Sequence, residues 1–67
     1  MLSKKTMDQV SCYNENTTDN DLMEVFVIGD DWYALKIGGV EITTGDSLHI
    51  EQRVNQIFRE NGLILMF

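Results

Sequence analysis

The residues that decide the fold are ALKIGGVEIT at positions 34–43, in which two runs of alternating apolar and polar side chains flank a pair of glycines. Gly38 and Gly39 supply the positive φ angles that a two-residue hairpin turn requires. A turn at these glycines places Ile37 opposite Val40 at the closed end of the hairpin. The stretch therefore predicts two antiparallel strands joined by a tight turn.

The same register gathers the apolar side chains of this hairpin on one face of the predicted sheet. Four residues share that face: Leu35, Ile37, Val40 and Ile42. On the other face Lys36 stands opposite Glu41, and such a pair adds roughly a few tenths of a kcal/mol. A slip of one residue would turn every apolar side chain toward solvent, so the pattern predicts Leu35 opposite Ile42.

A third strand is predicted over residues 22–28, LMEVFVI, which are rich in β-branched and aromatic side chains. Gly, Asp and Asp follow, a composition typical of turns. A loop closed over residues 29–32 places Ile28 opposite Tyr33, with Phe26 on the same inward face. The other face then carries four residues: Val25, Val27, Trp32 and Ala34. The three strands form an antiparallel meander.

A helix is predicted after the strands, because Asp46 or Ser47 can accept hydrogen bonds from the free amides of a first helical turn. Its apolar positions recur at helical spacing and form one stripe: Ile50, Val54, Ile57 and Phe58. The pair Asn61-Gly62 predicts the helix end, since glycine tolerates the left-handed conformation found there.

The chain ends in five apolar residues, LILMF at positions 63–67. A strand apolar on both faces normally lies inside a sheet or under a helix, and if it is left exposed its edge recruits partners. The sequence thus predicts a small α+β fold with a three-stranded antiparallel meander, one C-terminal helix packed on the sheet and a final short strand. We expect one domain over residues 1–67, with a poorly defined N-terminal segment 1–21 and a β-β-β-α-β core over 22–67.

Reactive side chains are scarce. Cys12 is the single cysteine and His49 the single histidine of the chain, so an internal disulfide is excluded and a Cys/His zinc site is disfavoured. Nothing near Cys12 in the sequence activates its thiol, and a half-buried thiol beside Tyr13 is its expected state. Residues 19–24 begin like a calcium loop, but Met23 stands where an oxygen ligand belongs. We therefore predict no catalytic residue, no metal site, no cofactor and no enzyme.

Charge is the most unusual feature of the composition. Eleven acids against five bases give a net charge of −6, and no Lys or Arg occurs between Thr6 and Leu35. Seven acids fall in that interval: Asp8, Glu15, Asp19, Asp21, Glu24, Asp30 and Asp31. A field of this sign repels phosphate backbones and attracts basic protein surfaces. Direct binding of nucleic acid is therefore disfavoured, and a protein partner with a basic surface is predicted.

The predicted partner-binding residues are five acids and one aromatic residue: Asp19, Asp21, Glu24, Asp30, Asp31 and Trp32. A row of carboxylates on a small sheet can imitate the charge spacing of nucleic acid, although surface acids ordinarily serve solubility. Trp32 is predicted on the face opposite Tyr33, where an exposed indole suits an interface. Packing of Trp32 against the N-terminal segment is the competing interpretation.

Size, acidity and the lack of catalytic residues lead to one functional hypothesis. They predict a small non-catalytic inhibitor or antagonist, of the kind that viruses and mobile elements encode, which docks an acidic face on a basic site of a protein. Two alternatives remain: an assembly or homodimerising subunit that pairs through residues 63–67, and an antitoxin or immunity protein. With no apolar run near the roughly 18 residues that span a bilayer, and no signal peptide, we expect a cytoplasmic location and no membrane partner.

Overall fold

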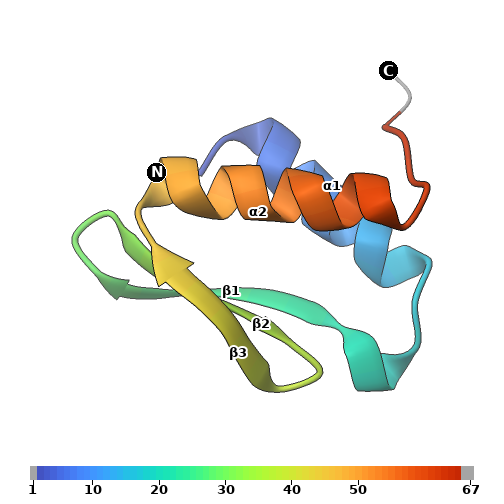
Figure 1. Ribbon diagram of the computed structural model, residues 1–67, viewed down its shortest axis with the longest axis horizontal. Coiled ribbons are helices and arrows are strands. Elements are labelled where there is room, and N and C mark those ends of the chain that lie inside the picture. The colour runs from blue at the N-terminus through green and yellow to red at the C-terminus, as the bar shows by residue number, and fades with distance from the viewer. Residues whose placement is uncertain (1, 66–67) are drawn as a thin grey trace.

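Two helices lie on one face of a three-stranded antiparallel sheet in the computed structural model, which describes residues 2–65 (Figure 1). The strands follow one another in the sheet in the order β1-β2-β3. The elements are α1 (Lys4–Glu15), a 3-10 turn η1 (Asp19–Asp21), β1 (Met23–Gly29), β2 (Trp32–Ile37), β3 (Val40–Gly45) and α2 (Ser47–Glu60). The predicted α+β class, the meander and the packed C-terminal helix are confirmed.

Helix α2 has the boundaries and the buried stripe that its sequence predicts. The Asp46 side chain caps the helix by accepting from the backbone N–H of His49 at 2.9 Å. The buried residues of α2 are those of the predicted stripe: Ile50, Val54, Ile57 and Phe58. At the other end Asn61 is the C-cap, and Gly62 follows with a φ of 72°. Local capping and apolar spacing agree here, which explains why the prediction holds.

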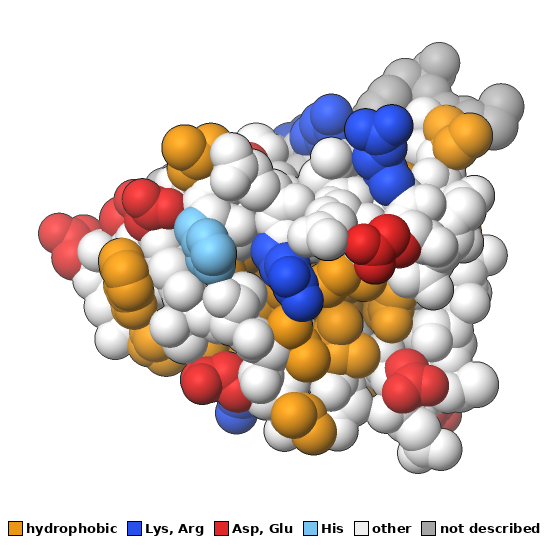
Figure 2. Space-filling model, viewed as in Figure 1, with side chains coloured by type: hydrophobic (Ala, Val, Ile, Leu, Met, Phe, Trp, Pro, Cys, Tyr) orange, Lys and Arg blue, Asp and Glu red, His pale blue; other side chains and the backbone are white. Residues whose placement is uncertain are grey.

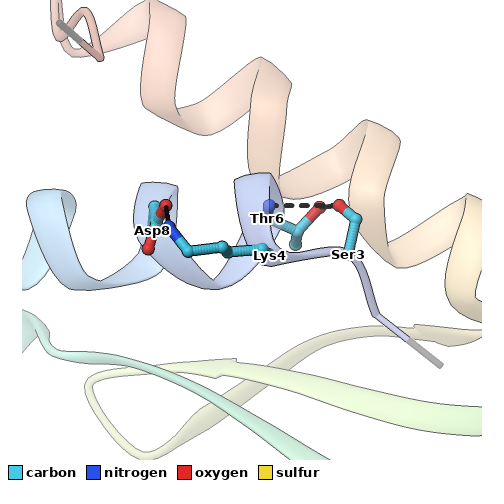
Figure 3. Close-up of polar contacts among 4 residues, drawn as sticks. All are labelled: Ser3, Lys4, Thr6 and Asp8. Carbon is cyan, nitrogen blue, oxygen red and sulfur yellow. Dashed lines mark hydrogen bonds and ion pairs between the residues drawn. The ribbon is translucent and has the colours of Figure 1, made fainter. Parts of the chain in front are cut away.

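Helix α1 lies within residues 1–21, for which the sequence predicts only a poorly defined segment. Ser3 caps it by accepting from the backbone N–H of Thr6, and Lys4 pairs with Asp8 one turn later at 3.0 Å (Figure 3). Two of its four buried residues are polar: Thr6, Gln9, Val10 and Tyr13. Polar side chains in the buried stripe hide the helical period from an apolar pattern.

The polar residues of that stripe are satisfied by α2. Gln9 donates to the side-chain oxygen of Asn55 at 2.8 Å. The Oε2 atom of Glu51 accepts from the backbone N–H of Ser3 at 3.2 Å and from the hydroxyl of Thr6 at 2.9 Å. Hydrogen bonding from Ser3, and next from Thr6, lowers the pKa of Glu51 below its ordinary value of 4.5.

This lowered pKa predicts a pH-dependent contribution of Glu51 to stability. A carboxyl whose pKa falls on folding stabilises the folded state fully above pH 4.5, and the contribution is lost as the pH falls through the lowered value. Glu51→Gln should therefore lower the urea midpoint at pH 7, and the two midpoints should converge as the pH falls below 4.5. Glu15→Gln, at an exposed position of α1, is the control. Its urea midpoint should match that of the wild type both at pH 7 and below pH 4.5. A gap that stays constant with pH would contradict this role of Glu51.

The β2–β3 hairpin closes as predicted and then departs from the predicted register. Ile37 pairs with Val40 and Lys36 with Glu41, and both glycines of the turn have positive φ. A bulge between Leu35 and Lys36 then shifts the pairing. The expected pairing of Leu35 with Ile42 is wrong, because the extra residue in β3 sets Thr43 opposite Leu35.

The β1–β2 register is also shifted by one residue from the prediction. The partner of Tyr33 is Val27 and not Ile28, and Phe26 pairs with Ala34. The connection is shorter than predicted, because Gly29 pairs with Trp32. Asp31 in this turn has a φ of 48°, and the register is irregular between Val27 and Gly29. The prediction that Phe26 faces inward is therefore wrong.

The inward face of the sheet supplies three of the nine buried residues of the core cluster. Its residues are Met23, Val25, Tyr33, Leu35 and Ile37, of which Val25 and Ile37 are partly buried. Both helices contribute the remainder of the cluster. The prediction that Val25 and Val27 share a face with Trp32 and Ala34 is corrected by the same shift, since Val25 lies opposite Leu35.

The end of the chain does not form the predicted strand over residues 63–65. These residues follow α2 without regular structure, and Leu63 and Leu65 pack partly against the core. Ile64 is 78% exposed. The remainder of the predicted strand, Met66 and Phe67, lies outside the described residues.

Asn14 connects α1 to the start of β1. Its side-chain amide donates to the backbone carbonyl of Met23 at 3.0 Å, and its side-chain oxygen accepts from the Met23 N–H at 2.8 Å. This pair of bonds has the pattern that a neighbouring strand would make. Asn14 therefore satisfies the Met23 backbone on the side of β1 that faces away from β2.

Candidate protein-binding surface

The face of the sheet that points away from the helices carries large exposed apolar side chains. Phe26 is 41% exposed, Trp32 48% and Ile42 39%. We call these three residues the outer patch. Exposed aromatic residues of this size are typical of binding surfaces and not of the solvated face of a sheet.

The strand register explains how the outer patch is assembled around Ala34. Phe26 on β1 and Thr44 on β3 are the direct neighbours of Ala34 on β2. Trp32 lies two residues before Ala34 on the same strand, so both side chains point to the same face. Ala34 is 2% exposed although no helix covers this face, since its larger neighbours surround it. A small residue thus forms the floor between large ones.

Lys36 lies on the same face between two carboxylates. It pairs across the sheet with Glu24 on one side and with Glu41 on the other. Its Nζ atom lies 5.0 Å from the centroid of the Phe26 ring, within the range of a cation–π contact. The single lysine of the strands is therefore held over the outer patch, and the two glutamates leave this part of the face with a net negative charge.

The charge of the chain is divided unequally between the two layers of the fold. Residues 17–45, which hold the strands, carry six acids and one lysine, whereas the remaining residues carry five acids and four bases. In Figure 2 most of the visible Lys and Arg side chains lie over the helical layer. Nearly all of the net charge of −6 therefore belongs to the layer that exposes the outer patch.

The structure places the six predicted binding residues in three locations, and all six are exposed. Two acids lie in η1 before β1, Glu24 lies on the outer face, and two acids form the β1–β2 turn, next to Trp32: Asp19, Asp21, Glu24, Asp30, Asp31 and Trp32. Residues 23–29 of β1 separate the two acidic pairs, a distance of roughly 20 Å at the rise of a strand. The acids therefore mark the two ends of β1 and do not form one cluster.

The residues of the outer patch that the sequence does not place there are Phe26 and Ile42. Each was predicted to face the core, and each was moved to the outer face by a register shift. The turn contained a signal for the first shift, because two adjacent aspartates suit a two-residue connection that pairs Gly29 with Trp32. The bulge in β3 has no comparable signal in the sequence.

The reactive residues are engaged in local contacts. Cys12 is partly buried, and its Sγ atom lies 3.8 Å from Nδ2 of Asn16. The Nε2 atom of His49 lies 2.8 Å from the Thr43 hydroxyl, a hydrogen bond between α2 and β3. Over residues 2–65 no group of three or more His, Cys, Asp or Glu side chains is arranged to hold a metal ion.

Neither α1 nor α2, the two helices of the described chain, is long and apolar enough to cross a membrane. No protein-family model, no curated protein and no solved structure matches the chain.

Proposed function

We propose that this protein is a small non-catalytic binding protein that inhibits or antagonises a protein with a basic surface. The outer patch makes the central contact, and the acids around it contact the basic residues of the partner. The observation that carries this proposal is the exposure of Phe26, Trp32 and Ile42 on a strongly acidic layer. Apolar anchors surrounded by charged residues are the usual arrangement of a specific protein interface.

Charge selects the kind of partner. Two copies that met through their outer faces would bring Glu24 and Glu41 of each copy against a layer of the same sign. A nucleic acid would be repelled for the same reason. A cationic protein surface is attracted electrostatically to this acidic layer. Trp32 supplies the large apolar area that such an interface buries.

The size and charge fit inhibitors encoded by viruses or mobile elements, as well as antitoxins and immunity proteins, and we place the interaction in the cytoplasm. Imitation of nucleic acid by the acids would serve the same end, by occupying a groove that normally holds phosphates. Assembly through residues 63–67 has less support, because Leu63 and Leu65 pack against the core of their own chain.

The experiment that tests this proposal measures binding of a partner recovered with the tagged protein. Trp32 is the only tryptophan of the chain, so its fluorescence reports contact at the outer patch directly. Trp32→Ala should weaken binding by about 30-fold, as expected for an aromatic hot spot. Raising the salt concentration from about 50 mM to about 500 mM should weaken the wild-type complex strongly.

Leu48→Ala is the matched control, because Leu48 is 62% exposed but lies on α2 in the helical layer. Its affinity for the partner should equal that of the wild type. Binding that survives Trp32→Ala and is insensitive to salt would refute docking through the outer face. Self-association of the purified protein at low salt would favour the homodimer instead.

A further inference from the structure

We infer that the free edge of β1 binds an extended segment of the partner as an added strand, and that this segment is apolar in its middle and basic at both ends. The inference rests on the proposed function for the charge of the partner. It concerns a different site, namely the edge of β1 and a groove beside it on the helical side of the sheet. The outer patch lies on the opposite face.

The bonds of β1 show which of its backbone groups are open. The Met23 N–H and C=O bond Asn14, and the carbonyl of the preceding residue, Leu22, accepts from Gly38 of the β2–β3 turn. Backbone groups alternate between the two edges of a strand. The N–H and C=O groups of Val25 and Val27 therefore point the same way as those of Met23, to the edge opposite β2. Among residues 2–65 no strand pairs with that edge.

A groove runs beside these open groups. It has a volume of about 500 Å³, and its apolar lining consists of Leu2, Met7, Val25, Val27 and Tyr33. Val27 is 74% exposed and Met7 46% exposed, large fractions for apolar side chains in a domain with so small a core. Residues of an added strand that stand opposite Val25 and Val27 would point to the same face as these valines. Their side chains would thus enter the groove, which sets the requirement for an apolar middle.

The acids at the two ends of β1 set the charge of the segment. Asp19 and Asp21 lie before the strand and Asp30 lies after it, where it also lines the groove. No Lys or Arg occurs between Thr6 and Leu35, so the segments that flank β1 carry no basic side chain of their own. An added strand that carries a Lys or Arg at each end can form favourable ion pairs with the acids at both ends of β1.

A second copy of this chain is a poor occupant of the edge. Antiparallel pairing of two β1 strands about Phe26 would set the β1–β2 turn of each copy beside η1 of the other. Carboxylates would then oppose carboxylates at both ends of the pair. The other edge of the sheet, β3, has its bulge opposite Leu35 and Lys36, within the paired stretch, and a bulge is a common protection against strand addition. The irregularity of β1 lies at the end of the strand, after Val27, and β1 contains neither Lys nor Pro.

The test uses a synthetic peptide, acetylated and amidated, of sequence Lys-Thr-Val-Thr-Val-Thr-Lys, and follows backbone amide shifts of the full chain by NMR. We expect saturable shifts at Val25, Val27 and Met7. The same peptide with Glu at both ends should bind at least about tenfold more weakly. N-methylation of both valines, which removes the donors to the edge, should weaken binding by about tenfold or more.

A variant pair tests the edge from the side of the protein. Val27→Pro removes an N–H that β2 does not use, so the fold should persist while peptide binding falls by about fivefold or more. Val27→Thr keeps the N–H and should bind like the wild type. If Val27→Pro does not fold, the N-methylated peptide tests the same strand pairing on the wild-type chain, through the bonds that the peptide N–H groups donate to the carbonyls of the β1 edge.

The outcomes separate this inference from the proposed function. Shifts confined to the surroundings of Trp32, equal binding of the N-methylated peptide, or no shift at millimolar peptide would overturn strand addition and leave docking through the outer face standing. Conversely, peptide binding at the edge that persists in Trp32→Ala supports the inference. Loss of partner binding in Trp32→Ala supports docking through the outer face and does not bear on strand addition.

Discussion

Replacing Leu35 with alanine should lower the free energy of unfolding by about 3 kcal/mol, which is most of the stability that one core supplies in a domain of this size. Leu35 is fully buried at the centre of β2, within the cluster that both helices cover. The cavity left by its side chain lies between layers that cannot collapse without breaking strand pairing. We expect urea denaturation, followed by circular dichroism, to show a variant that is partly unfolded even in buffer.

Leu48→Ala makes the same chemical change at a residue that is 62% exposed on α2. Its effect should be within about 0.5 kcal/mol, the range of ordinary surface substitutions. Equal losses in the two variants would contradict the placement of the core. The pair thus separates burial from the chemistry of a leucine truncation.

Gly38→Ala should be the second most damaging change, with a loss of about 2 to 3 kcal/mol. Gly38 has a φ of 61°, and a Cβ at this position would lie 2.6 Å from the backbone carbonyl oxygen of Asn20. Either the turn or η1 would have to move, and the 3.0 Å bond from the Gly38 N–H to the Leu22 carbonyl would be strained. Thermal unfolding in parallel with the wild type measures the loss.

Gly39→Ala is the control for backbone strain alone. Gly39 has a φ of 79°, but a Cβ there would meet no atom within 4 Å. A cost of about 1 kcal/mol is expected from the left-handed conformation. If both glycine variants lost the same stability, the close approach of η1 to the β2–β3 turn would not contribute to the fold.

The sequence predicted those parts of the fold that a few adjacent residues determine. Gly38 and Gly39 identify the turn because few other residues adopt their φ angles, and Asp46 identifies the start of α2 because its side chain caps the helix. Such features depend on a few adjacent residues. They can therefore be read before any long-range contact is known.

The remaining features depend on contacts between distant segments. Thr6 and Gln9 are buried because they form hydrogen bonds with Glu51 and Asn55 of the other helix. Neither the sequence of α1 nor that of α2 reveals this pairing on its own. The residues of the binding surface depend on register, since a shift of one position exchanges the two faces of a strand. Trp32 was placed correctly as an exposed residue, whereas Phe26 was not.

The contact of Asn14 with Met23 also bears on aggregation. Residues 25–28, VFVI, form an apolar, β-prone segment, and stacking into amyloid fibrils requires such segments to pair along about six residues. Because the Asn14 side chain already occupies the bonding groups of Met23, the groups of Val25 and Val27 are the ones left open along β1. The open stretch is therefore shorter than the segment that a growing fibril pairs along, and we expect Asn14 to limit misassembly of the chain.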